Sequence, residues 1–106
     1  MALPYSDKFI LGLTHADPES VGVQLAKVCV RAELPSLYIA EVFNVSRMSI
    51  HSWFRGGVIR DKNSVKIERF IELIEEDLAN GSLPAMNLPH ARTYLESEIK
   101  PKLDAV

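Results

Sequence analysis

Apolar residues in this chain recur at intervals of three and four positions, which is the spacing of an amphipathic helix rather than of a strand. Glycine and proline residues interrupt this pattern and divide the chain into segments of helical length. The pattern predicts an all-α fold, a compact bundle of about five helices near residues 18–33, 37–43, 47–54, 64–80 and 90–100. The 106 residues suffice for one domain built around one hydrophobic core.

Capping and stop signals place the ends of these helices. Asp17 suits the start of the first helix. Ser36 and Ser46 are candidate N-caps of the second and third, because their side-chain oxygens can accept hydrogen bonds from free backbone N–H groups. Gly81 predicts a left-handed stop after the fourth helix. Pro101 should end the fifth, because proline lacks the backbone N–H that a helix interior needs.

The two ends of the chain give weaker signals than its middle. The segment KFILGL, residues 8–13, is compatible with a short strand, a helical turn or an arm packed on the core. We divide the single domain into an N-terminal arm over residues 1–16, a core over 17–80 and a C-terminal helical extension over 81–106. The extension is a candidate oligomerisation segment.

Charge is distributed unevenly along the chain. The formal net charge is only -2, so the average composition does not indicate a polyanionic partner. Residues 46–70 nevertheless carry six Lys or Arg against two Asp or Glu, a net charge of +4. Residues 1–45 carry three against five, and residues 71–106 carry three against seven, which gives -2 and -4. A basic window between two acidic segments predicts a local site for an anionic partner.

The basic window overlaps the sequence SLYIAEVFNVSRMSIHSWFRGG, which has the spacing of a helix-turn-helix. Ala40 stands where two helices would cross closely and only a small side chain fits. Asn44 stands at the turn, where the backbone needs a positive φ that glycine or asparagine adopts most readily. Val45 should point into the core, and Ile50 and Trp53 have the spacing of one buried helix face.

The opposite face of the predicted 47–54 helix and the residue after it carry mostly hydrogen-bonding side chains. They are Arg47, Met48, Ser49, His51, Ser52 and Arg55. A rod of helical width fits the major groove of DNA, where base edges display distinct donor and acceptor patterns. The apolar back and polar front of this helix therefore predict that its front meets DNA bases.

The segment from about residue 20 to residue 74 resembles the Cro and λ-repressor family of helix-turn-helix domains. The residues that carry the resemblance are Ala40, Asn44, Val45, Ser46, Ile50 and Trp53, with the sequence RGG ending the reading helix. The resemblance implies a sequence-specific protein that binds double-stranded DNA, a small transcriptional regulator or repressor of the phage type that acts as a homodimer. The single long helix at 64–80 and the C-terminal extension depart from the family pattern.

The resemblance also implies which residues contact DNA. Ser36 and Leu37 would lie against the sugar-phosphate backbone. Arg47, nearest the start of the reading helix, would make a bidentate contact to a guanine. Arg55 and the loop over residues 56–62 would contact phosphates. The full predicted set is Ser36, Leu37, Arg47, Met48, Ser49, His51, Ser52, Arg55, Arg60 and Lys62.

No group of residues has the pattern of a catalytic or metal site. His51 has no second ligand at metal-binding spacing. Its side chain would lie about 100° around the helix from that of Ser52, a poor geometry for activating a hydroxyl. Cys29 is the only cysteine and sits in an apolar run, where a buried thiol is expected. We predict a protein that is not an enzyme and has no cofactor, metal or small-molecule substrate.

The first residues do not have the pattern of a signal peptide, and no apolar stretch is long enough to span a membrane. We therefore expect a cytoplasmic protein with no membrane partner, associated with the nucleoid or, if viral, located in the host cytoplasm.

Two other functions fit the same residues. An oligomeric DNA-recruitment subunit, such as a viral small terminase, would form a ring of many subunits rather than a dimer. A protein-interaction or inhibitor module derived from a helix-turn-helix would use the negative C-terminal half and ignore DNA even at low salt. The mass in solution and the salt dependence of DNA binding separate these functions from a dimeric regulator.

Overall fold

All regular elements in the part of the chain that the structure describes are helices. The computed structural model describes residues 5–106. The helices are α1 (Asp7–Thr14), α2 (Val21–Ala32), α3 (Ser36–Phe43), α4 (Arg47–Phe54) and α5 (Asp61–Ala79). A C-terminal rod follows, made of α6 (Leu88–Tyr94), a π-helical turn (Leu95–Ile99) and α7 (Lys100–Asp104). The all-α prediction is confirmed, but with the rod counted as one helix there are six helices rather than five.

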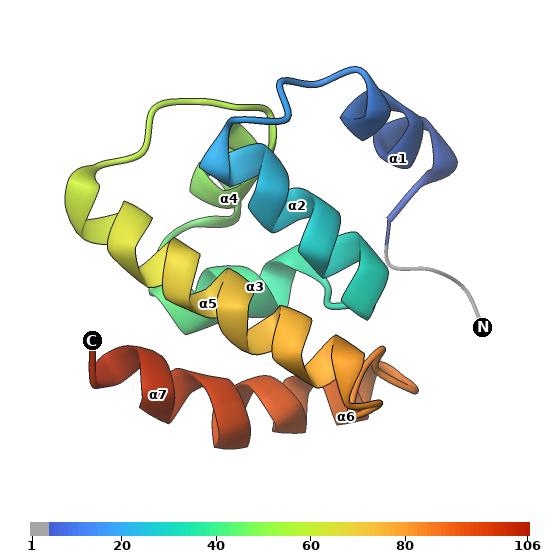
Figure 1. Cartoon of the computed structure of the whole chain (residues 1–106), viewed down its shortest axis with the longest axis vertical. Helices are drawn as coiled ribbons and strands as arrows, with labels where there is room; N and C mark the ends of the chain where they lie inside the picture. Colours follow the sequence, from blue (N-terminus) through green and yellow to red (C-terminus); the bar gives the residue numbers. More distant parts are fainter. Residues whose placement is uncertain (1–4) are drawn as a thin grey trace.

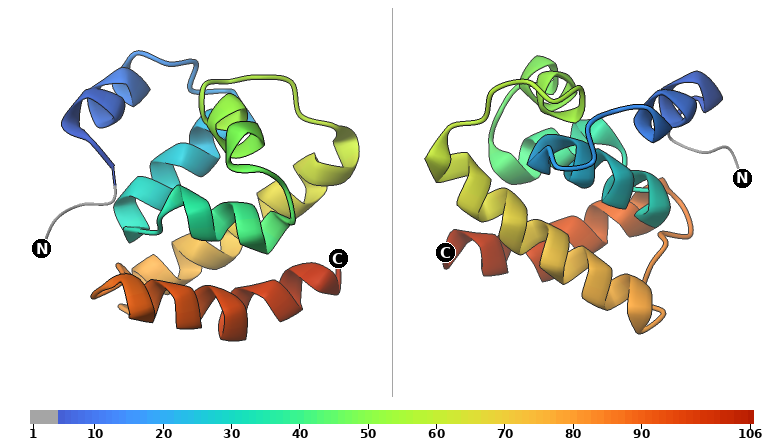
Figure 2. Two further views of the ribbon diagram at one scale, coloured as in Figure 1. Left: turned by 180° about the vertical axis from the view of Figure 1, so that it is seen from behind. Right: turned by 45° about the horizontal axis from the view of Figure 1, so that its top comes forward.

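The helices pack in an order that leaves α3 and α5 in the middle. In Figure 1, α2 and α4 lie above α5, α1 lies at the upper right, and the rod runs along the bottom. Seen from behind, α3 lies between α4 and the rod (Figure 2). The main helix contacts agree with this order, because α2 packs on α1, α4 and α5, whereas the rod packs on α3 and α5.

One hydrophobic core connects these helices. It includes Leu25, Val28 and Cys29 on α2 and Ile67, Phe70 and Ile74 on α5. Burial raises the pKa of the Cys29 thiol, which keeps it protonated at neutral pH. Within residues 5–106 no polar or charged residue is fully buried, so the polar side chains all remain in reach of solvent or a partner.

The segment KFILGL forms most of α1, so of the three alternatives the helical one is correct. The side chain of Ser6 caps this helix by accepting a hydrogen bond from the backbone N–H of Phe9 at 3.1 Å. Leu13 is buried, and Phe9 packs half-buried against the core. The predicted N-terminal arm is therefore helical from Asp7 to Thr14, while residues 1–4 of it lie outside the described residues.

The first predicted helix begins three residues later than expected, at Val21. Asp17 does not cap it, because its carboxylate accepts a hydrogen bond from the backbone N–H of Glu19 in a turn ahead of the helix. Ser20 caps α2 instead, with its hydroxyl oxygen 3.4 Å from the backbone nitrogen of Val23.

Two helices begin without a side-chain cap. Ser36 is the first residue of α3 rather than its cap, which is Pro35. α5 begins at Asp61, three residues earlier than predicted, with Arg60 in the cap position. Neither cap residue offers a side-chain hydrogen bond, so backbone N–H groups at both helix starts remain open. At the other end of α5, Gly81 has a φ of 86°, which confirms the predicted left-handed stop.

The prediction that Pro101 ends the last helix is wrong. The rod begins at Leu88, capped by Asn87, and continues three residues beyond Pro101. Proline lacks an N–H and its ring clashes with the carbonyl four residues earlier in an α-helix. A wider π-helical turn, in which the N–H of Lys100 donates to the carbonyl of Leu95, accommodates the proline. The rod buries Tyr94, Leu95, Ile99 and Leu103.

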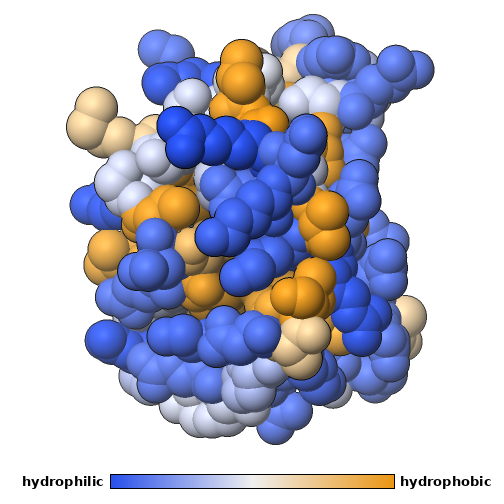
Figure 3. Space-filling view, turned by 90° about the vertical axis from the view of Figure 1, so that its left-hand side faces the viewer, coloured by the Kyte–Doolittle hydropathy of each residue, from blue (hydrophilic) through white to orange (hydrophobic). Residues whose placement is uncertain are grey.

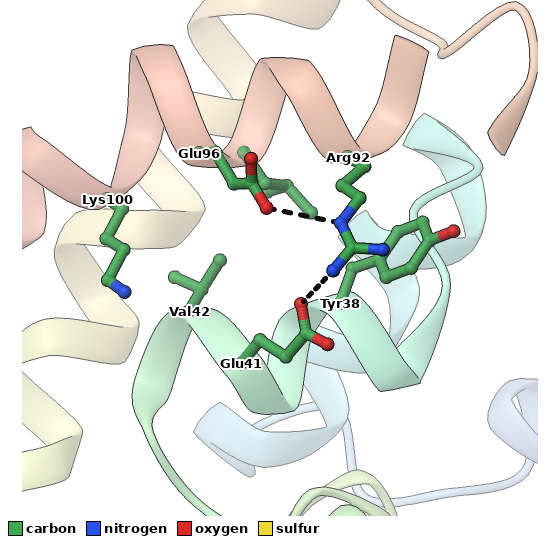
Figure 4. A pocket seen from close by; sticks show the side chains of 7 residues that line it. Tyr38, Glu41, Val42, Arg92, Glu96 and Lys100 are labelled. Carbon is green, nitrogen blue, oxygen red and sulfur yellow. Dashed lines mark hydrogen bonds and ion pairs between the residues drawn. The ribbon is translucent and has the colours of Figure 1, made fainter. Parts of the chain in front are cut away.

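Polar contacts also fasten the rod to α3. The guanidinium of Arg92 lies over the ring of Tyr38, with its central carbon 5.5 Å from the ring centroid. Its Nε lies 3.2 Å from Oε1 of Glu96, and its Nη2 lies 3.8 Å from Oε2 of Glu41 (Figure 4). These side chains line a cavity of about 50 Å³ together with Lys100. Arg92 is thus engaged within the fold.

Candidate nucleic-acid interface

A tight turn joins α3 to α4 at the residues predicted for it. Asn44 has a φ of 55° and a ψ of 47°, which is the left-handed conformation expected there. The N–H of Asn44 donates to the carbonyl of Glu41, and that of Val45 donates to the carbonyl of Ala40. Ala40 is 3% exposed, as a close helix crossing requires. Val45 was expected in the core but is only half-buried, at the edge of it.

The start of α4 is fixed by its predicted cap. The hydroxyl oxygen of Ser46 accepts a hydrogen bond from the backbone N–H of Ser49 at 3.1 Å. The Ser46 hydroxyl also donates to the hydroxyl oxygen of Ser49 at 3.1 Å. This cap satisfies one of the open N–H groups of the first turn, where Arg47 and Met48 are exposed.

The back of α4 is seated against α2 and α3. Ile50 is fully buried, and Trp53 packs edge-on against Phe43 with the ring centroids 5.8 Å apart. The backbones approach closely as well, since a Cβ atom on Gly22 of α2 would lie 2.0 Å from the carbonyl oxygen of Trp53. Only glycine fits at that crossing. The predicted burial of Ile50 and Trp53 is confirmed.

The end of α4 is supported by α1, a contact that the sequence did not indicate. Phe54 is 1% exposed, and its ring centroid lies 6.2 Å from that of Tyr5 and 6.0 Å from that of Phe9. The Tyr5 hydroxyl donates to the carbonyl of Leu34 at 2.6 Å, and burial raises the pKa of that hydroxyl. The half-buried ring of His51 lies edge-on to Phe54. α1 is therefore part of the scaffold that positions α4.

The two glycines after α4 have different roles. Gly56 has a φ of 88°, and its N–H donates to the carbonyl of Trp53 at 2.9 Å. The N–H of Gly57 donates to the carbonyl of Ser52 at 2.8 Å, and a Cβ atom on Gly57 would lie 2.4 Å from the Ser52 hydroxyl oxygen. The first glycine supplies the left-handed conformation and the second permits the close approach, so the chain folds tightly over the end of α4.

All ten residues of the predicted DNA-contact set are accessible at the surface. The exposed ones are Leu37, Arg47, Met48, Arg55, Arg60 and Lys62. The half-buried ones are Ser36, Ser49, His51 and Ser52. The α4 residues share one helix with a buried back, whereas Ser36 and Leu37 lie at the far end of α3 from the turn.

A trough connects α4 with the start of α5. One depression of about 340 Å³ lies among α4, the loop and the first turn of α5, and a second of about 300 Å³ adjoins it. Both are lined by Val45, Arg60 and Asn63, so they lie side by side. We call the two depressions together the basic trough; their polar lining consists of Asn44, Ser49, Ser52, Arg60, Lys62, Asn63 and Lys66. Hydrophilic side chains dominate the middle of the molecular face on which α5 begins (Figure 3).

Asn63 and Lys66, two polar residues of α5 that line the basic trough, are absent from the predicted contact set. Lys66 lay within the basic window, and that charge was the available signal for it. Asn63 lies between the loop predicted over residues 56–62 and the helix predicted over residues 64–80, so the sequence gives it no contact role. The start of α5 at Asp61 places Asn63 in the first turn and Lys66 in the second, where both face the trough.

Five cations in and after α4 have no partner within the described chain. They are Arg47, Arg55, Arg60, Lys62 and Lys66, with Asp61 as the one carboxylate between residues 47 and 66. The ion pairs found in residues 5–106 all lie elsewhere and involve Arg69 or Arg92. The uncapped start of α5 adds the positive end of a helix dipole beside the trough. The interface is therefore open to an anionic group.

Comparison with known proteins gives no family assignment, because no family model, curated protein or solved structure matches this chain. The helices between residues 5 and 106 lack the combination of length and apolar character that crossing a membrane requires. Those same residues bring together no set of three His, Cys, Asp or Glu side chains that could hold a metal ion. The chemistry of the interface is thus the basis for inferring a function.

Proposed function

We propose that the chain is a sequence-specific protein that binds double-stranded DNA, a small transcriptional regulator. In this proposal α3 and α4 form a helix-turn-helix of the Cro and λ-repressor type, and α4 reads base edges in the major groove. The observation that carries the proposal is the seating of α4. Ile50, Trp53 and Phe54 are buried, while Met48 on the opposite side of the same helix and Arg47 at its first position are exposed.

The dimensions of α4 suit such a role. A helix with its side chains is about 10–12 Å wide, and the major groove of B-DNA is about 12 Å wide. α4 has eight residues and therefore extends about 12 Å, which matches a few base pairs of groove. Its first two residues are exposed, as a helix that enters the groove with its N-terminal residues requires.

The outward side chains of α4 can distinguish bases. Arg47 presents a planar fork of donors that suits the O6 and N7 acceptors of guanine. Ser52 and His51 add short polar groups that can hydrogen-bond to neighbouring base edges. These contacts would supply sequence information, which phosphate contacts alone cannot provide.

The residues after α4 would hold the phosphate backbone. Arg55, Arg60, Lys62 and Lys66 carry unpaired charges in the segment that connects α4 to α5 and in the first turns of α5. The open N–H groups at the start of α5 add donors for a phosphate oxygen beside them. The basic trough would then accommodate one strand of the backbone next to the groove that α4 occupies.

A homodimer is part of this proposal. A single module of this kind buries only about 600–1,000 Å² on DNA, which limits both affinity and specificity. Two copies on half-sites about one helical turn apart would double the contact and give a palindromic operator.

Selection of bound sequences from a random duplex pool tests the proposal directly. The expected result is one preferred, palindromic site, bound in the nanomolar range at about 0.15 M salt and weakened steeply as salt rises. Equal binding of random and selected duplexes at that salt would exclude a sequence-specific regulator. No binding even at low salt would exclude DNA as the partner altogether.

Replacing Arg47 by alanine tests the reading role of α4. We expect Arg47→Ala to weaken the selected site by about 1–3 kcal/mol while binding to random duplex changes much less. Lys102→Ala is a matched control, because Lys102 is an exposed cation on the C-terminal rod. Equal losses for selected and random duplexes in Arg47→Ala would assign Arg47 to the phosphates instead.

A further inference from the structure

Met48 is the most exposed large apolar side chain on any described helix. It is 82% exposed, against 63% for Leu11 and 55% for Val65 and Leu88. It contributes nothing to the core, which α4 reaches through other residues. Single exposed apolar side chains are common on protein surfaces, so the position of Met48, and not its exposure alone, decides what it can contact.

The position of Met48 around α4 is the central one for a partner. At about 100° per residue, Ile50, Trp53 and Phe54 lie between about 140° and 240° around the helix from Met48. Met48 therefore lies directly opposite the buried back of α4. Arg55 and Ser52 lie within about 40° of it on either side. Any surface that meets the front of α4 must touch Met48.

The surroundings of Met48 do not form a protein-docking patch. Its neighbours on the front of α4 are Ser52 and Arg55, and Arg47 precedes it in the chain, so the residues around it are charged or polar. Protein interfaces are centred on larger apolar areas than one side chain provides. An isolated apolar side chain among hydrogen-bonding ones instead fits a surface that is mostly polar and has one apolar group.

The floor of the DNA major groove is such a surface. Each base pair presents donors and acceptors there, and the one apolar group is the 5-methyl of thymine. Burying a thioether side chain against that methyl removes both from water. Over cytosine or a purine, the same side chain would cover polar groups without satisfying them. The unbranched, flexible side chain of methionine can adjust to the position of the methyl.

We propose that Met48 reads the 5-methyl group of a thymine in each half-site and so makes thymine a required base there. This role of Met48 rests on the proposed DNA binding by α4. It predicts a thymine close to the base that Arg47 contacts, because the two side chains are adjacent in the first turn of the helix.

Single thymine-to-uracil replacements in the selected duplex test this role, since uracil differs from thymine only by the missing methyl. For the wild-type chain, replacing the thymine that Met48 contacts should weaken binding about fourfold in each half-site. Replacing any other thymine should leave binding unchanged. Met48→Ala should bind the thymine and uracil duplexes equally. Met48→Leu, which keeps an apolar side chain, should retain most of the difference.

Met86→Ala is the matched control, because Met86 is 75% exposed but lies in the loop before α6, outside the candidate interface. It should bind both duplexes as the wild type does. Thermal melting of each variant confirms that it is folded, which is expected because neither methionine is buried.

The outcomes separate the role of Met48 from the proposed function. A selected site that contains no thymine, or that binds equally well with every thymine replaced, overturns the role of Met48 and leaves the regulator intact. A Met48→Ala variant that still prefers thymine assigns the methyl contact to another residue and also overturns it. If the wild type selects no site, both proposals fail together.

Discussion

The C-terminal rod and the segment from α4 to α5 use their charged side chains in different ways. On the rod, Arg92 pairs with Glu96, reaches Glu41 on α3 and covers Tyr38 (Figure 4). Between residues 47 and 66, five cations lie close together in sequence with one carboxylate and no ion pair among the described residues. One region uses a cation to fasten the fold, and the other leaves its cations free.

This difference is more informative about function than the total charge. Like charges near one another raise the free energy of the folded state, and a bound polyanion would offset that cost. Exposed ion pairs contribute little to stability, so ion pairs within the chain would have stabilised the folded state only slightly. A cluster of unpaired cations beside the buried back of α4 therefore fits the proposed anionic partner, even in a chain whose net charge is -2.

The helix starts show the same contrast. α6 opens the rod with Asn87, whose side-chain oxygen accepts from the backbone N–H of His90 at 2.8 Å. α5 opens beside the basic trough with Arg60, which offers no side-chain acceptor. The rod thus satisfies one N–H group of its first turn with a side chain, whereas no side chain does so at the start of α5.

The largest effect should come from disturbing the seat of α4. We expect Gly22→Ala to destabilise the chain by about 3 kcal/mol or more, because its Cβ would overlap the carbonyl oxygen of Trp53 and push α4 outward. Chemical denaturation measures the loss, and binding to the selected duplex should weaken with it. The rod lies on the other side of α3 and should keep its contacts.

Gly12→Ala is the control for this substitution. A Cβ on Gly12 meets nothing within 4 Å, so alanine in the middle of α1 should stabilise the chain by about 0.5–1 kcal/mol. If Gly22→Ala were as stable as Gly12→Ala, α2 and α4 could not cross as closely as described.

A smaller effect should follow from removing cations in the two regions in turn. We expect the double variant Arg60→Gln, Lys62→Gln to lower DNA affinity by on the order of tenfold or more at about 0.1 M salt. The slope of log affinity against log salt should fall by about two, because two phosphate contacts are lost. Titrations at several salt concentrations measure both quantities.

Lys100→Gln with Lys102→Gln gives the same change of net charge on the rod. This pair should leave the salt slope unchanged. Both lysines belong to the rod, which packs on α3 and α5 and contributes no residue to the basic trough. An equal fall in slope for the two double variants would mean that DNA responds to overall charge and not to the basic trough.

The sequence predicts the α3–turn–α4 unit well because the signals for it are local. Ser46 and Asn44 act on backbone groups within a few residues of themselves, and the bounds of α4 match the prediction at both ends. The buried face of α4 follows from spacing alone. The exposure of the ten contact residues agrees with the predicted front, while their contact with DNA stays a prediction.

Other features depend on contacts between distant segments, which spacing does not reveal. The helical conformation of α1 depends in part on Phe9 packing against Phe54, 45 positions along the chain. The early start of α5 moved Asn63 into the trough. Pro101 would end an isolated helix, but the burial of Ile99 and Leu103 stabilises the π-helical detour around it.

The smallest effect should come from the rod itself. The Tyr94 hydroxyl donates to a carboxylate oxygen of Asp77 at 2.5 Å and so ties α6 to α5. Tyr94→Phe removes that hydrogen bond and keeps the ring, so we expect a loss of about 1 kcal/mol at neutral pH. DNA affinity should not change, because this contact lies outside the interface. A clear loss of affinity would show that the rod takes part in binding and would remove the contrast between the two regions.

The pH dependence of stability separates the hydrogen bond from simple packing of the ring. Burial, and next the hydrogen bond to Asp77, raise the pKa of Tyr94 above the value of 10.0 for an exposed tyrosine. Its contribution to stability is therefore complete below pH 10 and is lost as the pH rises further, because the unfolded chain then releases the proton first. Denaturation at neutral pH and above pH 10 should show a steeper decline for the wild type than for Tyr94→Phe. The pKa of Tyr5 is also raised, so stability should still fall somewhat above pH 10 in both proteins. Identical declines would mean that Tyr94 ionises as readily in the folded chain as in the unfolded one, so that its hydroxyl could not be held as described.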